Sequence, residues 1–358
     1  MVRLRRVSPN STGWTRRKRG RGMVYLDAAG APLAAEDVAR IKALVIPPAW
    51  ADVWISPYAN GHIQAVGVDA AGRRQYLYHP QWRLQRDQLK FERVSTIAHS
   101  LPTAREAVRE HLMLERMPLE RAAATAVRLL DLGYFRIGSD VYADENGSFG
   151  LTTLEKRHVR LRNGRLVFGF TGKSGVDHII EIDDAEVMAA VDVMRRRRGG
   201  TRLLAFKSGR GWVDMDASRV NGYLKEVVGE ELTAKDFRTW HATVIAAAAL
   251  ASSPEPGNTP TSRKRAVRSA VVEVSQYLGN TPTVARSSYI DPRVIDLYDD
   301  GITIEEAVRE TYDTSAERQR ALESAVLTML SEAPESGTRA SRTRGPRAKA
   351  PGSVRRAS

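Results

Sequence analysis

Apolar and polar residues alternate between residues 24 and 80 with the period of two that is typical of β-strands. Residues 51–56 show this alternation and end before a proline. The segments 62–68 and 73–78 repeat it on either side of Asp69-Ala-Ala-Gly72, a run of turn-forming residues, and this arrangement predicts a β-hairpin. The first part of the chain is therefore expected to be rich in strands.

Beyond Pro80 the hydrophobic period lengthens toward 3.6 residues, as in amphipathic helices. Alternation returns only from Gly150 to about Ile182, where a sheet is predicted. The predicted helices are Ala35–Leu44 in the first region and, in the second, Gln81–Ser100, Ala104–Leu114, Leu119–Leu132, Asp184–Arg197, Ala217–Val228, Ala234–Ala251, Thr261–Leu278, Pro292–Asp299 and Thr303–Leu330.

These patterns predict an α+β protein with a small strand-rich N-terminal domain over residues 23–90. A larger, mainly helical domain with a small antiparallel sheet is predicted over residues 91–330. Residues 1–22 carry several Arg and Lys and no acidic residue, which favours a flexible basic arm. Residues 331–358 offer little apolar surface and are expected to form a disordered basic tail. Either end could contact DNA phosphates or simply be solvated.

Charge and composition narrow the choice of partner. The 358-residue chain has a formal net charge of +13, which favours nucleic acid, although charge that only aids solubility is the alternative. The absence of cysteine excludes disulfides, thiolate metal sites and cysteine nucleophiles, and it fits the cytoplasm. No apolar run approaches the length of a membrane span and none follows the basic first residues, so neither a membrane segment nor a secretory signal is expected.

Several common catalytic motifs are absent from the sequence. There is no HExxH and no cluster of His and carboxylates at metal-ligand spacing, so no metal site is predicted. Gly172-Lys173-Ser174 resembles the end of a P-loop, but Val167 replaces the glycine required five residues earlier, and ATP binding is not expected. A GxSxG nucleophile elbow is also missing.

Cleaving a nucleic acid strand without a metal requires a nucleophile, a proton donor for the leaving sugar oxygen and fixed positive charge beside the phosphate. Two arginines suit the last role. Arg136 follows a long apolar helix, and Arg238 lies in the first turns of a helix opened by a predicted capping box of Thr233 and Asp236, where N–H groups favour anions. His241 lies one turn further along the same face.

Lys173 and Tyr289 suit the other two roles. Alternating residues lead into and out of Lys173, which predicts a lysine at a hairpin tip, able to follow the leaving oxygen and donate a proton. Tyr289 lies between two helix starts, Thr281-Pro282 and Asp291-Pro292, after a helix that ends at Gly279. Taken singly, a tyrosine is usually a half-buried core residue, a hairpin lysine is usually solvated, and an arginine near a helix start is usually a surface charge or an ion-pair partner. Only their joint order indicates a function.

The order Arg136, Lys173, Arg238, Asn280, Tyr289, with its flanking words, resembles the type IB DNA topoisomerases of poxviruses and bacteria. The words cover most of the chain between the two basic ends and, as a series in fixed order, are specific, although each alone is weak. They are Val45-Ile-Pro-Pro48, Gly72-Arg-Arg-Gln-Tyr-Leu-Tyr78, Arg136-Ile-Gly, Glu145-Asn-Gly-Ser-Phe-Gly-Leu-Thr-Thr-Leu154, Gly172-Lys173, Lys235-Asp-Phe-Arg238 and Leu278-Gly-Asn-Thr-Pro282.

The resemblance implies that Tyr289 attacks a phosphodiester, forms a 3′-phosphotyrosyl link and frees a 5′-hydroxyl. Arg136 and Arg238 would hold the nonbridging oxygens, and Lys173 would protonate the 5′ oxygen. Asn280 takes the place of a histidine of poxviral and eukaryotic relatives. A neutral amide still donates a hydrogen bond to phosphate but adds no charge. No metal, cofactor or ATP is implied.

The resemblance also implies DNA contacts at Arg73, Gln75, Tyr76, Tyr78 and Tyr142. Aromatic and amide side chains on an exposed hairpin suit groove and sugar-phosphate contacts. The alternative for the two hairpin tyrosines is ordinary packing, because alternate residues share one face of a strand.

As a member of this family the chain would be a monomer that clamps double-stranded DNA between two domains, in the cytoplasm and on the nucleoid. While one strand is open, the downstream DNA would swivel, release supercoils of either sign and be rejoined.

Two alternatives stay open at this point. A tyrosine site-specific recombinase shares this chemistry, and Arg238-Thr-Trp-His241 resembles its arginine box. Recombinases usually begin with a helical domain, however, whereas residues 72–78 lie in a strand-rich one. A non-catalytic basic DNA-binding protein of the chromosome would bind DNA in a salt-dependent way without forming a covalent adduct.

Overall fold

A computed structural model describes residues 3–20, 22–133, 135–138, 147–229, 232–253 and 259–332. The chain divides into two compact units, with the division between Val94 and Ser95, inside the long helix α2 (Pro80–Leu112). No helix in the described part of the chain is long and apolar enough to cross a membrane. The architecture confirms the predicted α+β class. The domain boundaries expected at residues 22, 90 and 330 remain predictions.

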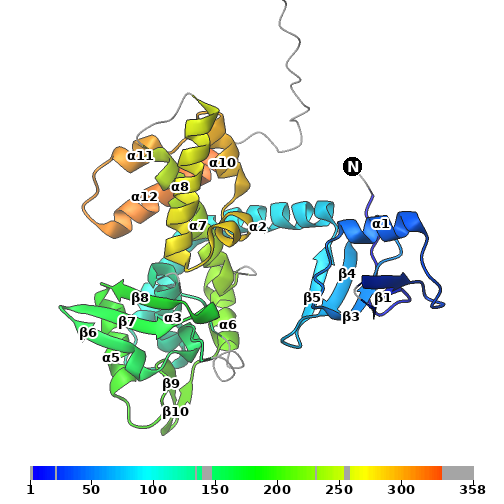
Figure 1. Cartoon of the computed structure of the whole chain (residues 1–358). Coiled ribbons are helices and arrows are strands. Elements are labelled where there is room, and N and C mark those ends of the chain that lie inside the picture. Colours follow the sequence, from blue (N-terminus) through cyan, green and yellow to red (C-terminus); the bar gives the residue numbers. More distant parts are fainter. Residues whose placement is uncertain are drawn as a thin grey trace, which may run out of the picture. The chain divides into compact units, whose positions relative to one another are not determined.

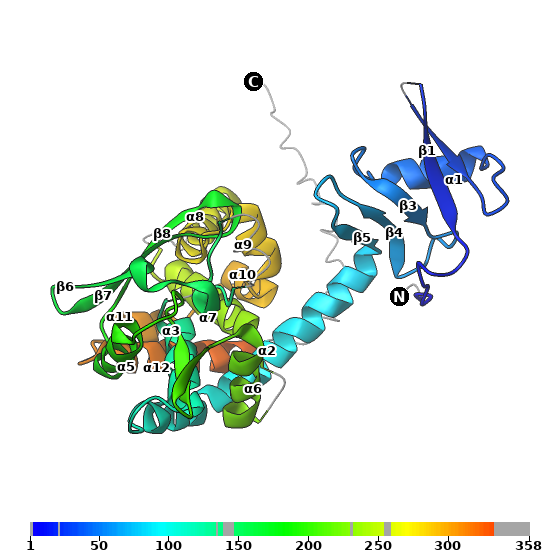
Figure 2. The same cartoon turned by 90° about the horizontal axis from the view of Figure 1, so that it is seen from below.

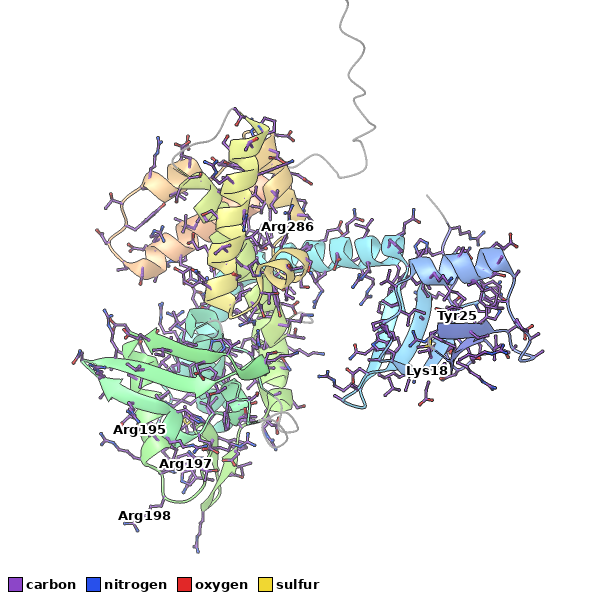
Figure 3. The ribbon with its side chains drawn as sticks, viewed as in Figure 1. Lys18, Tyr25, Arg195, Arg197, Arg198 and Arg286 are labelled. Carbon is purple, nitrogen blue, oxygen red and sulfur yellow. The ribbon has the colours of Figure 1, made fainter. Side chains whose placement is uncertain are left out.

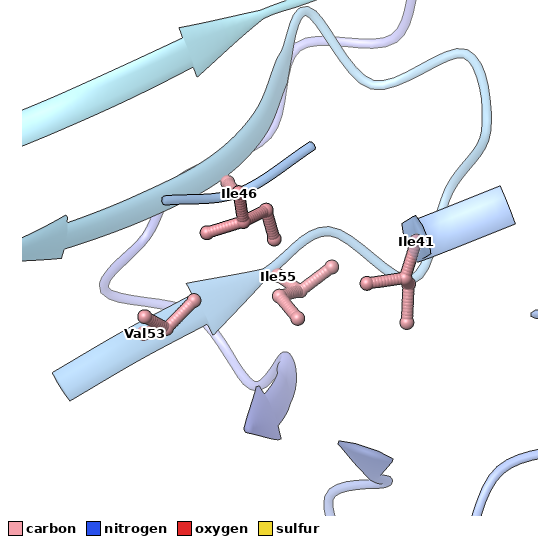
Figure 4. Close-up of a cluster of buried hydrophobic side chains, with 5 residues drawn as sticks. Ile41, Ile46, Val53 and Ile55 are labelled. Atoms are coloured by element: carbon pink, nitrogen blue, oxygen red, sulfur yellow. The ribbon is translucent and has the colours of Figure 1, made fainter. Parts of the chain in front are cut away.

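The N-terminal unit is an antiparallel five-stranded sheet in the order β2-β1-β3-β4-β5, drawn in blue in Figure 1. One helix, α1 (Ala35–Ala43), contributes Ile41 to its core, where it meets Ile46, Val53 and Ile55 (Figure 4). The predicted hairpin of β4 and β5 is confirmed by pairing from Ile63↔Tyr78 to Val68↔Arg74. The strands are β1 (Trp14–Arg19), β2 (Gly22–Leu26), β3 (Ala51–Ile55), β4 (Ile63–Val68) and β5 (Arg74–Tyr78).

The prediction of a flexible arm over residues 1–22 is wrong for Trp14–Arg19, because this segment forms strand β1 between β2 and β3. Trp14 packs against the core of the unit. Arg16 donates to three backbone carbonyls, those of Ile46, Pro47 and Trp50, at 2.8–3.2 Å. These contacts offset the entropy of ordering a basic segment.

Helix α2 is continuous where the sequence predicts two helices, Gln81–Ser100 and Ala104–Leu114. Pro102 lies inside it, although proline removes a helix hydrogen bond and costs several kcal/mol. An unbroken buried stripe offsets this cost, because Val94, Leu101 and Val108 are all at most 3% exposed.

The C-terminal unit combines helices with a three-stranded antiparallel sheet in the order β6-β7-β8. Helix α3 is its central element and packs against β8, β9, α5, α6 and α7. Its helices are α3 (Leu119–Gly133), α5 (Ala185–Arg196), α6 (Ala217–Val228), α7 (Ala234–Ala251), α8 (Pro260–Leu278), α9 (Pro282–Ser288), α10 (Pro292–Asp299), α11 (Glu305–Arg309) and α12 (Ser315–Ser331). Its strands are β6 (Val159–Arg162), β7 (Arg165–Thr171), β8 (Asp177–Ile182), β9 (Ala205–Ser208) and β10 (Gly211–Asp214).

Two features of this unit differ from the prediction. The single helix expected over Thr303–Leu330 is divided into α11 and α12, because Thr314 and Glu317 form a capping box that starts a new helix. The hairpin of β9 and β10 is a further addition. The tail expected to be disordered from residue 331 lies outside the described residues from 333 onward, and Ser331 itself ends α12.

Not every residue of the basic runs is available to a polyanion. Arg197, labelled in Figure 3 within the run Arg195–Arg198, is 7% exposed and donates to the carbonyls of Met194, Arg202 and Leu203. Its neighbour Arg198 is exposed, as is Arg286 on α9. Part of the positive charge therefore stabilises loops, and only the remainder can attract a polyanion.

Candidate active site

Arg136 lies directly after α3, in a short segment clamped to residues 150–151. The N–H of Leu151 donates to the carbonyl of Arg136 at 2.7 Å. Gly138 has a φ of 96°, and a methyl carbon on Gly150 would lie 2.5 Å from the Cα of Gly138. Only glycines at positions 138 and 150 allow the two backbone segments to pass this closely. The close contact fixes the backbone position of Arg136.

Arg238 lies one turn into α7. The predicted capping box is confirmed, since the N–H of Thr233 donates to the Asp236 carboxylate at 2.9 Å. Arg238 is only 5% exposed. A guanidinium so deeply buried carries a large desolvation cost, which is acceptable where the charge has a specific use.

The C-terminal end of α8 binds both arginines. Arg238 donates to the carbonyl of Leu278 at 2.7 Å, and Arg136 donates to the carbonyl of Gly279 at 2.9 Å and to the side-chain oxygen of Asn280. Gly279 closes the helix in the left-handed region, with a φ of 57°. Carbonyls at a helix C-terminus carry partial negative charge, so this end is a natural mount for two cations.

Tyr289 is the C-cap residue of α9, and its N–H donates to the carbonyl of Ala285 at 3.1 Å. The guanidinium carbon of Arg238 lies 5.5 Å from the centre of the Tyr289 ring, and the two side chains also share a hydrogen bond. Thr243 on α7 accepts from the N–H of Asp291 at 3.2 Å and so ties the segment after Tyr289 to the helix that carries Arg238.

The electrostatics around the two arginines favour an anion. Burial lowers the pKa of Arg238 to about 10, Tyr289 opposes the shift, and Arg136 adds to it. Burial also lowers the pKa of Arg136. With a pKa of about 10, Arg238 stays charged at neutral pH, and an anion beside the two guanidiniums would relieve their mutual repulsion.

Lys173 begins a single turn, Lys173–Gly175, that joins β7 to β8, which confirms its predicted place at a hairpin tip. Ser174 and Gly175 both have positive φ, and the N–H of Gly172 donates to the carbonyl of Val176 at 2.7 Å. The Lys173 side chain is exposed. An exposed lysine on a tight turn can reach toward a substrate without rearranging the core.

His178 is a residue of this site that the sequence patterns did not single out. It is half-buried on β8, pairs in register with Phe170 and lies close enough to Arg136 and Arg238 for both to lower the pKa of its imidazole, after burial as the largest cause. Strand alternation could have found it, since His178, Ile180 and Ile182 share the inward face of β8.

A cavity of about 500 Å³ brings together the two arginines and His178, whereas Lys173, Asn280 and Tyr289 are not part of its lining. Its lining includes Arg136, Arg238, Gly172, His178 and Tyr277. Among the described residues no group of three or more His, Cys, Asp and Glu could hold a metal ion. The positive charge facing this cavity comes from arginines, which suit the oxygens of a phosphodiester.

Four of the five expected DNA-contact residues lie on β5 and the turn before it, and none of these four lines the cavity. Tyr76 and Tyr78 are each 39% exposed on one face of this edge strand, with ring centres 5.9 Å apart. Arg73 and Gln75 both donate to the carboxylate of Asp69, at 3.0 and 2.9 Å. Tyr142 lies outside the described residues.

Each of the two units is similar to a domain of known proteins. Residues 79–318 match the model of the eukaryotic DNA topoisomerase I catalytic core, and residues 22–69 match the N-terminal domain of bacterial DNA topoisomerase IB. DNA topoisomerase 1B of Acanthamoeba polyphaga mimivirus is 30% identical over 275 residues, 74% of this chain and 80% of that protein. DNA topoisomerase 1B of vaccinia virus (strain Copenhagen) is 19% identical, over 69% of this chain and 76% of its own length. DNA topoisomerase 1 of Schizosaccharomyces pombe is 28% identical over 48% of this chain and 20% of its own length.

A helical unit that sets a tyrosine beside a buried and a half-buried arginine, joined to a strand-rich unit, is the architecture of an isomerase that acts on DNA. The chain belongs to the type IB DNA topoisomerase family. This confirms the resemblance seen in the sequence and decides against the recombinase and the non-catalytic chromosomal protein.

Proposed function

We propose that the chain relaxes supercoiled DNA by a tyrosine-dependent exchange of phosphodiester bonds that needs neither metal nor ATP. The Tyr289 oxygen attacks the phosphorus and loses its proton to water, the bond to the 5′ oxygen breaks, and Lys173 gives that oxygen a proton. One phosphate ester replaces another, so the strand can be rejoined by the reverse reaction without an energy source. Supercoils of either sign are released while the strand is open.

The observation that carries this proposal is that the C-terminal end of α8 accepts hydrogen bonds from both arginines. This helix end holds Arg136 and Arg238 by two carbonyls, and Tyr289 lies under the second guanidinium. Two fixed cations beside a nucleophile can stabilise the charge that develops on a phosphate during attack. They supply the positive charge for which other nucleases and topoisomerases use a metal.

Further parts of the proposal concern the partner and its binding. The substrate is double-stranded DNA, gripped by a monomer that closes two domains on it, on the nucleoid. Tyr76 and Tyr78 present stacked rings on an exposed edge strand, which suits sugar and groove contacts. Arg73 and Gln75 would exchange their bonds to Asp69 for bonds to DNA, and Tyr142 is proposed as a further contact on the resemblance alone.

The test is relaxation of supercoiled plasmid in excess EDTA without ATP, comparing the unaltered protein with Tyr289→Phe. A matched control is Tyr312→Phe, since the Tyr312 hydroxyl lies within hydrogen-bonding distance of the Ala307 carbonyl and of the Glu310 carboxylate, and its side chain is not part of the pocket lining. We expect relaxation by the unaltered protein and the control, and none by Tyr289→Phe. A strand labelled at its 5′ end should move with the protein on a denaturing gel. Relaxation by Tyr289→Phe would refute the assignment of the nucleophile.

A further inference from the structure

His178 stands at the end of a stack of rings that leads to Arg136. Its imidazole stacks on Phe170 with the ring centres 5.2 Å apart and the planes 25° from parallel. Phe170 in turn stacks on Phe135, at 5.9 Å and 15°. Phe135 is fully buried and directly precedes Arg136. The stack thus joins β8, β7 and the segment that carries a catalytic arginine.

The imidazole also fills the space between two glycines from different elements. A methyl carbon on Gly172, before Lys173, would lie 2.6 Å from Cδ2 of His178. A methyl carbon on Gly279, before Asn280, would lie 2.2 Å from its Cε1. Since real contacts of this kind do not fall below about 3 Å, both positions require glycine as long as the ring is there. In Figures 1 and 2, β8 lies beside α8, as these contacts require.

We propose that His178 is a positioning residue for strand cleavage, whose ring, wedged between Gly172 and Gly279, sets the place of the Lys173 turn relative to the two arginines. The inference rests on the proposed role of Lys173 as proton donor. The His178 ring limits how closely the β7–β8 hairpin can approach the end of α8, because it occupies the space between Gly172 and Gly279.

The surroundings favour an uncharged ring in this role. Burial, Arg136 and Arg238 lower the pKa of His178, and Asp177 on its own strand opposes them. Lys173 lies on the adjoining turn, and Glu273 and Tyr277 of α8 line the same cavity. A neutral flat ring keeps its stacking and its fit between the glycines without adding a third cation to the pocket.

This role predicts a loss that depends on the leaving group. Cleavage at an oxygen requires the proton from Lys173, whereas a 5′-sulfur leaves as a thiolate and requires little help. If His178 only places the Lys173 turn, its removal will slow cleavage of the oxygen substrate and spare that of the sulfur substrate. Damage to the fold or to the arginines would slow both alike.

The experiment measures single-turnover cleavage of duplex DNA with a bridging 5′-oxygen or 5′-sulfur at the scissile phosphate. For His178→Ala we expect a loss of roughly ten- to a hundredfold with oxygen, the scale for a misplaced catalytic group, and little loss with sulfur. His178→Phe keeps a flat ring and should restore most of the rate. Gly172→Ala should show the same oxygen-selective loss, and adding His178→Ala to it should recover part of the rate by removing the clash.

Equal slowing of both substrates by His178→Ala would overturn the inference, as would a His178→Phe variant no faster than His178→Ala. Lys173→Ala separates this failure from that of the proposed function. If sulfur rescues Lys173→Ala but not His178→Ala, the wedge alone is wrong. If sulfur rescues neither, the general-acid assignment fails and the wedge fails with it.

Discussion

Asn280 presents the sharpest question about the site, because the family resemblance implies a histidine of poxviral and eukaryotic relatives in its place. Arg136 donates to its side-chain oxygen, so the amide nitrogen must point elsewhere. That nitrogen is buried, and it has no hydrogen-bond acceptor in the part of the chain that the structure describes. An unsatisfied buried donor is costly, and a phosphate oxygen in the pocket would satisfy it. We therefore predict that Asn280 donates to the substrate.

The size of the effect follows from the kind of bond lost. A hydrogen bond to a charged group contributes roughly 1.5–3 kcal/mol, which corresponds to about ten- to 150-fold in rate if the bond acts in the transition state. Asn280→Ala should fall in this range. Asn280→Asp keeps the shape and the acceptor for Arg136 but replaces the donor with a charge. Repulsion between this carboxylate and the phosphate is on the order of 4 kcal/mol. The cleavage rate of Asn280→Asp should therefore fall about a thousandfold below that of the unaltered protein.

The assay is single-turnover cleavage with excess protein over duplex DNA, alongside a separate measurement of binding. Asn280→His serves as the matched control, since an imidazole can also donate to phosphate. We expect it to retain most of the rate. A rate for Asn280→Ala close to that of the unaltered protein, or an Asn280→Asp variant as fast as Asn280→Ala, would refute the role of the amide nitrogen as a donor.

Three other predictions concern charge in the C-terminal unit. Arg238→Lys should slow cleavage by about a hundredfold, because an ammonium cannot reproduce the fork that reaches both Leu278 and a phosphate; a normal rate with normal DNA binding would contradict this. Arg105→Met should lower the free energy of unfolding by about 3–5 kcal/mol, because Arg105 binds the buried carboxylates of Asp131 and Glu323 at 2.7–2.9 Å; urea denaturation measures it, and an unchanged midpoint would refute it. Because the folded chain lowers the pKa of His178, the unfolded chain takes up a proton first as pH falls below 6.5, so stability should decline there; thermal melts of His178→Phe should decline less, and parallel curves would refute this.

The sequence predicted the parts of the site that local rules control. The capping box of Thr233 and Asp236, the helix end at Gly279 and the hairpin tip at Lys173 each follow from short-range preferences, and all three are confirmed. The resemblance supplied the family, which the comparisons confirm, whereas the individual roles of the site residues remain proposals.

Long-range packing explains what the sequence could not show. Nothing local to Pro102 indicates that a buried stripe would carry a helix through it. Arg16 looks like a solvated charge until its three carbonyl partners arrive from residues 46–50. The alternation along β8 marks His178 as inward-facing, but its contact with Gly279 joins elements far apart in the sequence and could not be predicted. Gln75 and Tyr76, expected to act together, point to opposite faces of β5.

The end of α8 makes catalysis sensitive to events that never touch DNA. Because Leu278 and Gly279 each accept from one guanidinium, fraying of the last helical turn would loosen both arginines at the same time. Heating should therefore abolish cleavage before the chain as a whole unfolds. Small changes among the residues packed behind this turn, such as Val274, should act on turnover more than on melting temperature. A small molecule lodged beside Tyr277 would inhibit in the same way, by loosening a helix end instead of competing for phosphate.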